Sequence, residues 1–360
     1  MLELAPELLP VLRAGSAVAV VTIIGVPRSA PLGVGASMAV TADGRVIGSI
    51  SGGCVEGDAV LLSHAVLRDG VGRTARFGFT DEAASAAGLA CGGAIDVVVY
   101  RIDPTDAAAL SALALAAADR RVAMGVTCGD RDPGRILPAE VLPDRSMEVA
   151  DSRMLPAAYD GSDLLVLTHR PRPRLIIAGA GDHAAALCRV ATAAGFAVSV
   201  CDPWELLVTR ERFPDAERLV AGLPHEYLRS IPADELDERT AVCVLTHDER
   251  IDVPALRAAL ALPIGFVGAM GSRSTVARRA QLLRQSGVDE DDLARLHSPL
   301  GLDLQGTTPD ETAIAVLAEI VAARRHGTGL PLRDLSSAVH RSTGEVDRSC
   351  SPALTSEARR

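Results

Sequence analysis

The chain has 360 residues, of which 48% are hydrophobic and 2% aromatic, so it can form two domains with cores mainly of Ala, Val, Leu and Ile. Its formal net charge of −10 argues against nucleic acid as a partner bound over a broad face. All 36 basic residues are arginine, which excludes a lysine-dependent phosphate loop and a pyridoxal Schiff base.

The first half of the chain is expected to be a mixed α/β domain over residues 1–169. A short helix up to Arg13 precedes a strand at 18–24. Strands at 34–40 and 45–50 flank the turn signal Thr41-Ala42-Asp43-Gly44, which predicts a hairpin. A helix at 55–67, a strand at 94–100, a helix at 106–118 and a strand at 122–128 follow. Residues 131–159 form a polar stretch with several prolines.

Two loops at strand ends each place a cysteine beside two glycines. The first contains Ser51-Gly52-Gly53-Cys54 and ends with Glu56, and the second is Cys91-Gly92-Gly93. Glycines let backbone N–H groups converge into an anion-binding concavity, and a thiol in that field is biased toward the thiolate, which binds metals and handles sulfur. The alternative is that Cys54 and Cys91 are small buried residues in tight turns.

The sequence also predicts the compartment. Seven cysteines without a Cys-x-x-Cys pair give no zinc signature. Residues 1–6 lack the features of a signal peptide, and the longest apolar run, 17–24, is too short to span a bilayer. We therefore expect a soluble cytoplasmic protein with reduced thiols and no membrane partner.

A second domain is expected over residues 170–329, after the stiff linker Arg170-Pro171-Arg172-Pro173-Arg174. Strands predicted at 175–178, 197–202, 240–246 and 264–267 alternate with helices at 184–195, 276–286 and 309–325, which is typical of a Rossmann-like parallel sheet. The last helix begins with a capping signal, Thr308 followed by Pro309 and Glu311. Residues 330–360 are polar and are expected to be a disordered tail.

The loop Gly179-Ala180-Gly181-Asp182-His183 fits the fingerprint of dinucleotide binding, and Asp202 ends the next strand. Glycines there let the backbone approach a pyrophosphate, and the aspartate can bind a ribose hydroxyl. Asp182 departs from the pattern: it either places a carboxylate where a phosphate would arrive or caps the helix. Trp204 is expected to be a packed surface ring, with stacking on a base as the alternative.

Two further loops follow predicted strands of this domain. Thr246-His247-Asp248 lies where open α/β sheets keep their crevice, and His247 is either a site residue or a hydrogen-bonded loop residue. The segment Gly268-Ala269-Met270-Gly271-Ser272-Arg273 begins a helix that carries Arg278 and Arg279. Its N–H groups, hydroxyls and guanidinium predict a second anion cradle, and the alternative is a plain glycine-rich turn.

Taken together, these motifs resemble the xanthine dehydrogenase accessory family, or XdhC/CoxI family, over residues 10–325. The resemblance rests on residues 48–56, 89–93, 179–181, 246–248 and 268–273 and on Gly301-Leu302-Asp303. Two positions depart from the family pattern: Leu32 stands where we expect arginine, and Asp182 precedes His183.

The resemblance implies an accessory protein rather than a metabolic enzyme. Such proteins bind molybdenum cofactor, often in a cytosine dinucleotide form, while a sulfido ligand is installed with the help of a cysteine desulfurase. They then deliver it to an apo molybdenum hydroxylase of the xanthine dehydrogenase or carbon monoxide dehydrogenase type. The family also suggests a homodimer.

The resemblance further implies roles for particular residues. Cys54 and Cys91 would contact or protect the molybdenum, and Glu56 would hydrogen-bond the pterin. The candidate cofactor-binding residues are Ser51, Gly52, Gly53, Cys54, Glu56, Cys91, Gly92, Gly93, Gly179, Gly181, His183, Asp202, His247, Gly268, Met270, Gly271, Ser272 and Arg273.

Two other functions remain open on the sequence. One is an NAD(P)-dependent oxidoreductase that uses the Rossmann-like domain, with His247 as its only natural candidate acid. The other is a sulfur-transfer or thiol-redox enzyme that uses Cys54 and Cys91 as a pair.

Overall fold

The computed structural model describes residues 1–27, 30–53, 55–78, 94–129, 132–143 and 151–335. The chain divides into two compact units, Met1–Arg172 and Pro173–Arg360. The sequence analysis placed this boundary between residues 169 and 170. Within the described residues, no helix combines the length and the apolar character needed to cross a membrane.

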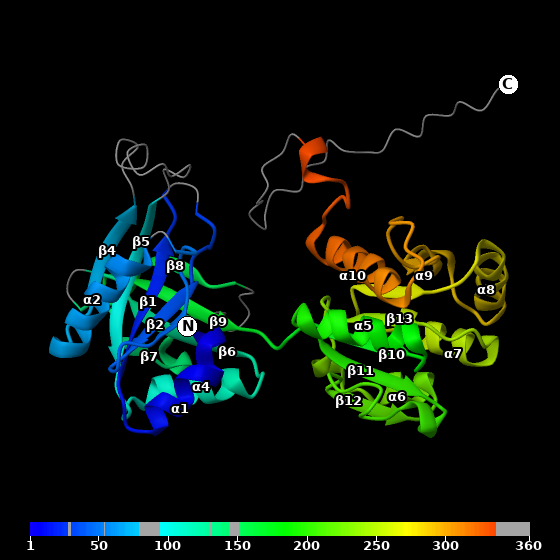
Figure 1. Ribbon diagram of the computed structural model, residues 1–360, viewed down its shortest axis with the longest axis horizontal. Helices are drawn as coiled ribbons and strands as arrows, with labels where there is room; N and C mark the ends of the chain where they lie inside the picture. Colours follow the sequence, from blue (N-terminus) through cyan, green and yellow to red (C-terminus); the bar gives the residue numbers. More distant parts are fainter. Residues whose placement is uncertain (28–29, 54, 79–93, 130–131, 144–150, 336–360) are drawn as a thin grey trace. The chain divides into compact units, whose positions relative to one another are not determined.

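An antiparallel sheet with the strand order β3-β2-β1-β5-β4 forms one layer of the N-terminal unit (Figure 1). Its strands are β1 (Val18–Gly25), β2 (Ser37–Thr41), β3 (Val46–Gly48), β4 (Arg73–Gly78) and β5 (Ala94–Ile102). The predicted hairpin is confirmed, because β2 and β3 pair and Gly44 takes the left-handed φ of +85° that the turn requires. Helix α2 (Glu56–Asp69) packs its apolar side chains against this sheet.

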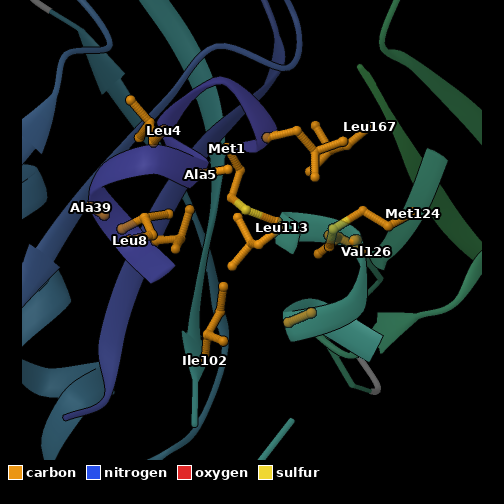
Figure 2. Close-up of a cluster of buried hydrophobic side chains, with 14 of the residues drawn as sticks. Met1, Leu4, Ala5, Leu8, Ala39, Ile102, Leu113, Met124, Val126 and Leu167 are labelled. Atoms are coloured by element: carbon orange, nitrogen blue, oxygen red, sulfur yellow. The ribbon is translucent and has the colours of Figure 1, made fainter. Parts of the chain in front are cut away.

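The second layer has the strand order β7-β6-β9-β8. Its strands are β6 (Val122–Thr127), β7 (Ile136–Leu137), β8 (Arg153–Tyr159) and β9 (Ser162–His169). Helices α1 (Ala5–Arg13) and α4 (Ala107–Ala117) contribute to the core between the two sheets. Figure 2 shows Leu8, Ile102, Leu113 and Met124 from four different elements in this cluster. Because each such side chain contributes about 1.5–3 kcal/mol when buried, an aliphatic core of this size holds the two sheets together.

The C-terminal unit confirms the predicted Rossmann-like parallel sheet. Its strands are β10 (Arg174–Ala178), β11 (Ala197–Asp202), β12 (Arg218–Ala221), β13 (Ala241–Val244), β14 (Phe266–Ala269) and β15 (Leu296–His297). They are parallel, in the order β12-β11-β10-β13-β14-β15 (Figure 1). The chain order reverses between β10 and β13, so the switch point where such sheets bind ligands lies beyond the carboxyl ends of these two strands.

Helices cover both faces of this sheet. Helices α5 (Asp182–Ala193) and α10 (Pro309–Arg325) pack on one face, and α6 (Pro224–Ser230), α7 (Glu249–Leu260) and α8 (Arg273–Gln285) pack on the other. The alternation along β10 explains this division, since Leu175 and Ile177 face α5 whereas Ile176 and Ala178 face α7. The remaining elements of the described residues are α9 (Glu290–Ala294) and the 3-10 helices Leu2–Leu4, Ala139–Val141, Glu205–Leu207, Ala233–Glu235 and Leu332–Asp334.

The predicted capping box at the start of α10 is confirmed. The Thr308 hydroxyl accepts the Glu311 N–H at 3.2 Å, and the Glu311 carboxylate accepts the Thr308 N–H at 3.0 Å.

Candidate functional site

Glu56, the first residue of α2, organises the first glycine loop. Its two carboxylate oxygens accept backbone N–H groups at 2.9–3.3 Å from Ile50, Ser51, Gly52, Gly53 and Val55. The hydroxyls of Ser49 and Ser51 donate two more bonds, at 2.7 and 2.6 Å. The N–H groups therefore converge as the glycines indicate, but the anion that they hold is the chain's own carboxylate.

These bonds keep Glu56 charged. Burial raises the pKa of Glu56, but the hydrogen bonds from Ser49, Ser51 and the backbone outweigh it and hold the pKa well below its ordinary value of 4.5. The family resemblance implies that this carboxylate hydrogen-bonds a pterin, whereas in the structure both of its oxygens accept hydrogen bonds from the loop. Two of its partners, Gly53 and Val55, lie on either side of Cys54 in the sequence, so Glu56 fixes the backbone that flanks this cysteine.

The surface of this loop is free of side chains at two positions. Gly52 and Gly53 have φ values of +82° and +123°, which disfavour any other residue. A Cβ built on either glycine would meet no atom within 4 Å, so the space beside them is open. Cys54, Cys91, Gly92 and Gly93, which the sequence analysis placed at this site, lie outside the described residues.

The described cysteines are not reactive thiols. Cys128, Cys188, Cys201 and Cys243 are buried. Burial raises the pKa of Cys188 to about 11 and that of Cys128 and Cys201 to about 12, and it raises the pKa of Cys243 further. Among the described residues, no group of three or more His, Cys, Asp or Glu side chains could hold a metal ion.

The glycine loop of the C-terminal unit lies at the switch point. Gly179 follows β10 with a φ of +114°, and a Cβ there would come within 2.9 Å of Thr246 Cγ2 and 3.2 Å of the Thr246 backbone nitrogen. Gly179 is thus required by the close approach of the loops after β10 and β13. Gly181 differs: its φ of −81° suits any residue, and a Cβ there would meet nothing within 4 Å. The backbone is open to a ligand at Gly181.

Asp202, at the end of β11, is bonded to the chain itself. Its Oδ2 accepts the Ala180 N–H at 3.0 Å, and its Oδ1 accepts the Trp204 N–H at 2.9 Å. The side chain that the fingerprint assigns to a ribose hydroxyl therefore joins the glycine loop to the segment after β11. Trp204 is 68% exposed, so the prediction of a packed surface ring is wrong.

Asp182 begins α5, and its carboxylate is 87% exposed. It lies 3.5 Å from the guanidinium of Arg212, which comes from the loop between β11 and β12. The N-cap of the helix is Gly181, so the interpretation of Asp182 as the cap is wrong. His183 is half-buried and His247 is exposed.

A buried ion pair, which the sequence did not predict, connects the loops at the carboxyl ends of the parallel strands. Arg279 and Asp252 are each 3% exposed, and Arg279 Nη2 donates to Asp252 Oδ2 at 2.9 Å. The same nitrogen donates to the Met270 carbonyl at 2.8 Å, and Nη1 donates to Ser298 Oγ at 3.3 Å. Asp252 also accepts the hydroxyl of Thr246. The pair therefore connects the ends of β13, β14 and β15.

The two arginines of the helix that follows the predicted second anion cradle have partners within the chain. Arg279 is committed to the interior, and Arg278 pairs with Glu249 of α7. Ser272 caps α8 by accepting the Thr275 N–H at 3.3 Å, and Ser272 and Arg273 remain exposed.

The structure gives a packing or backbone reason for glycine at two positions of the predicted second anion cradle. A Cβ on Gly268 would come within 2.4 Å of Leu300 Cδ1 and 2.9 Å of Phe266 Cε1, so a larger residue there would have to displace these side chains. Gly271 has a φ of +158°, and a Cβ on it would meet Thr275 at 3.2 Å.

The candidate residues of the C-terminal unit thus lie at the carboxyl ends of its parallel strands. Asp202 joins Gly179-Ala180-Gly181 to Trp204, Gly179 touches Thr246, and the buried pair joins Thr246 to Met270. The buried arginine and aspartate lie 27 positions apart, and no local pattern pairs them.

The two glycines of the fingerprint should respond differently to substitution. We expect Gly179→Ala to destabilise the protein by about 2–3 kcal/mol, because the residue must hold a strained φ against the Thr246 backbone. Gly181→Ala should cost less than about 1 kcal/mol, because a Cβ fits there and the backbone stays as it is. Urea unfolding of both variants followed by circular dichroism checks this; equal losses would contradict the assignment of Gly181 as a position open to ligand.

Comparison with known families covers both units. A model described as the XdhC and CoxI family matches residues 11–78, and a model of the XdhC Rossmann domain matches residues 175–320.

Three curated relatives have similar sequences. Escherichia coli YqeB is 32% identical over 198 residues, which are 53% of this chain and 36% of YqeB, so the match spans about a third of that relative. The E. coli molybdenum cofactor insertion chaperone PaoD is 26% identical over 88% of this chain and 86% of PaoD. A Bacillus subtilis protein, named as a probable component of xanthine dehydrogenase, is 28% identical over 84% of this chain and 92% of that protein.

A solved structure shares the fold. The crystal structure of a xanthine dehydrogenase from Bacillus halodurans has a TM-score of 0.70 and 23% identity, and the match covers 89% of this chain and 96% of that one. The motifs, the parallel sheet and the two family models agree. This chain belongs to the XdhC and CoxI family.

Proposed function

We propose that this chain is a maturation factor that binds molybdenum cofactor and inserts it into an apo molybdenum hydroxylase of the xanthine dehydrogenase or carbon monoxide dehydrogenase type. The observation that carries the proposal is the match to PaoD, a molybdenum cofactor insertion chaperone, over most of the length of both chains. The B. subtilis relative, a probable component of xanthine dehydrogenase, supports the class of client.

The residues of the N-terminal unit fit a bulky ligand with a soft metal. Glu56 holds the backbone at Gly53 and Val55, on either side of Cys54, and the side-chain-free surface at Gly52 and Gly53 leaves room for a ligand. Thiolates suit a soft metal centre, so Cys54 and Cys91 are the residues that would contact or protect it. Glu56 is a positioning residue in this account, because its oxygens are occupied by the loop. When bound, the cofactor would supply a molybdenum dithiolene and a phosphate.

The finer part of the proposal concerns assembly and partners. A cysteine desulfurase would supply the sulfur for the sulfido ligand while the cofactor is held. The protein would act as a homodimer in the cytoplasm, as an accessory protein rather than an enzyme. The acidic net charge of −10 suits a protein that meets other proteins rather than nucleic acid.

Pterin content tests the proposal directly. The protein is purified from a molybdenum-replete host, oxidised and assayed for pterin fluorescence. We expect bound pterin in the wild type and a loss of about tenfold in Cys54→Ser and in Cys91→Ser, since a soft ligand is replaced by a hard one. Cys128→Ala is the control, because Cys128 is buried in the same unit and its loss should leave pterin content unchanged. Undiminished pterin in both serine variants would overturn the cysteine assignment.

A second candidate function is favoured by one observation. The strand order of the C-terminal unit and its Gly179-Ala180-Gly181 loop are those of dinucleotide-binding folds, which supports an NAD(P)-dependent oxidoreductase. Titration of the protein with NAD(H) and NADP(H) separates the two. Tight binding of one of them, in a protein that carries no pterin, would favour the oxidoreductase.

A further inference from the structure

We propose that the segment 203–213, which follows β11, forms a nucleotide subsite in which Trp204 stacks on the base and Arg212 pairs with a phosphate. The ligand class is a nucleoside 5′-diphosphate. This chemistry is shared by a cytosine dinucleotide form of molybdenum cofactor and by NAD, and the choice of the first rests on the proposed function.

The first observation is the exposure of two apolar side chains at one position of the fold. Trp204 is 68% exposed and Leu206 is 90% exposed, and both follow the carboxyl end of β11. Trp204 is the only tryptophan of the chain. An indole presents a flat face on which a base stacks, and such a contact contributes whatever the identity of the base.

The second observation ties this ring to the glycine loop. The buried carboxylate of Asp202 accepts the Trp204 N–H through one oxygen and the Ala180 N–H through the other, at 2.9 and 3.0 Å. The backbone of Trp204 and the glycine loop are therefore held beside each other by a single side chain. Asp202 therefore positions the subsite by holding its backbone against the glycine loop.

The third observation is a positively charged side chain, Arg212, near the glycine loop. At the other end of the segment, Arg212 lies 3.5 Å from Asp182, the residue after Gly181. This pair is long and its aspartate is 87% exposed, so it is a weak surface contact. A phosphate offers more charge and more acceptor oxygens than the carboxylate, so it competes well for the guanidinium. Asp182 thus acts as an internal competitor that a bound phosphate displaces.

Together these contacts favour a nucleotide over a protein partner. The exposed large apolar side chains of the segment are Trp204 and Leu206. Asp202 ties the start of the segment to the glycine loop, and Arg212 ties its end to Asp182, beside the open backbone at Gly181. A base and a diphosphate match this combination of a flat ring and a cation. An apolar protein surface would offer no hydrogen-bond acceptor to the guanidinium of Arg212.

Tryptophan fluorescence, excited selectively over that of tyrosine, is the first test, because Trp204 is the only tryptophan of the chain. Wild-type protein is titrated with cytidine 5′-diphosphate, adenosine 5′-diphosphate, NAD+ and inorganic pyrophosphate. We expect saturable quenching by cytidine diphosphate, and competition by pyrophosphate without quenching, since pyrophosphate has no base. Saturable quenching by the adenine ligands alone would support the subsite and contradict the proposed function. Absence of quenching by all nucleotides would overturn the inference.

Calorimetric titration of variants with the same nucleotide separates the two contacts. We expect binding about tenfold weaker in Trp204→Leu and in Arg212→Gln, from the loss of stacking and of a charged hydrogen bond. Asp182→Asn should bind about threefold tighter, because the competing carboxylate is removed. Arg189→Gln is the matched control, an exposed arginine of α5 that pairs with Asp310 and should have no effect.

The same variants show whether the inference and the proposed function fail separately. Pterin retained by a wild-type protein that binds no nucleotide would overturn the subsite alone. Nucleotide binding that depends on Trp204 and Arg212 in a protein that never carries pterin would support the subsite and overturn the proposed function.

Discussion

Replacement of Arg279 by methionine should destabilise the C-terminal unit by about 3–5 kcal/mol, because it leaves a buried carboxylate without its partner. Arg279 and Asp252 are each 3% exposed, and the guanidinium also bonds to the Met270 carbonyl and to Ser298. The loss of stability should therefore be greatest in the loops after β13, β14 and β15, which carry candidate ligand-binding residues.

Hydrogen exchange followed by mass spectrometry measures this loss where it occurs. Peptides that cover β13 and β14 should lose about a hundredfold or more in protection in Arg279→Met, which follows from the conversion of about 1.4 kcal/mol per factor of ten. Arg278→Met is the matched control, since Arg278 is the neighbouring residue but pairs with Glu249 at the surface. It should cost less than about 1 kcal/mol. Equal losses in the two variants would contradict the structural role of the pair.

The double variant Asp252→Leu and Arg279→Met provides an independent check. Because removing both charges leaves no unpaired ion, the double variant should be less destabilised than Arg279→Met alone. If the losses measured for Asp252→Leu alone and for Arg279→Met alone add up to the loss of the double variant, the two side chains do not act as a pair.

Replacement of Glu56 by glutamine should cost about 2–4 kcal/mol, because the new NH2 group faces N–H and hydroxyl donors that need an acceptor. The exposed position of Gly52 and Gly53 lets water replace some of these bonds, so the loss is smaller than their number implies. Cofactor retention should fall with it, since Glu56 bonds to the residues on both sides of Cys54. Asp58→Asn, in the first turn of the same helix, is the control and should cost less than about 1 kcal/mol.

The effect of Glu56→Gln on stability should depend on pH, because the pKa of Glu56 is low in the folded protein. The folded protein holds the pKa below the value of 4.5 expected for the unfolded chain, because the loop hydrogen bonds favour the charged form. The stabilisation from Glu56 is therefore fully present above about pH 4.5 and is lost progressively as the pH falls toward the folded pKa. Thermal unfolding of wild type and Glu56→Gln should differ by a constant amount between about pH 5 and 8 and converge in more acid solution. A gap that persists unchanged in acid would rule out a charged Glu56.

Local patterns predicted most of the regular structure. The strand 197–202 and the helix 309–325 have the predicted bounds, because an apolar β-branched run and a capping box mark their ends. Strand β8 lies in the polar stretch with several prolines, for which no strand was predicted. Its residues include Pro156 and none of them is fully buried, so only pairing with β9 reveals the strand.

The site was harder to predict because its contacts are not local. The glycines indicated converging N–H groups, but Glu56 fills the concavity because the chain folds back over the seven positions from Ser49. Arg279 was expected near an exposed anion cradle, and only the packing of α7 against α8 buries it beside Asp252. Trp204 was expected to be packed, yet it is exposed, which sequence alone did not indicate.

Transfer of cofactor to a client tests the central claim most directly. The pterin-loaded protein is incubated with an apo molybdenum hydroxylase of the xanthine dehydrogenase type, and both hydroxylase activity and the pterin left on this chain are measured. The account predicts that activity appears in proportion to the pterin lost from the chain, and that the Cys54→Ser protein gives neither. Pterin that stays on the chain while the hydroxylase remains inactive would contradict it.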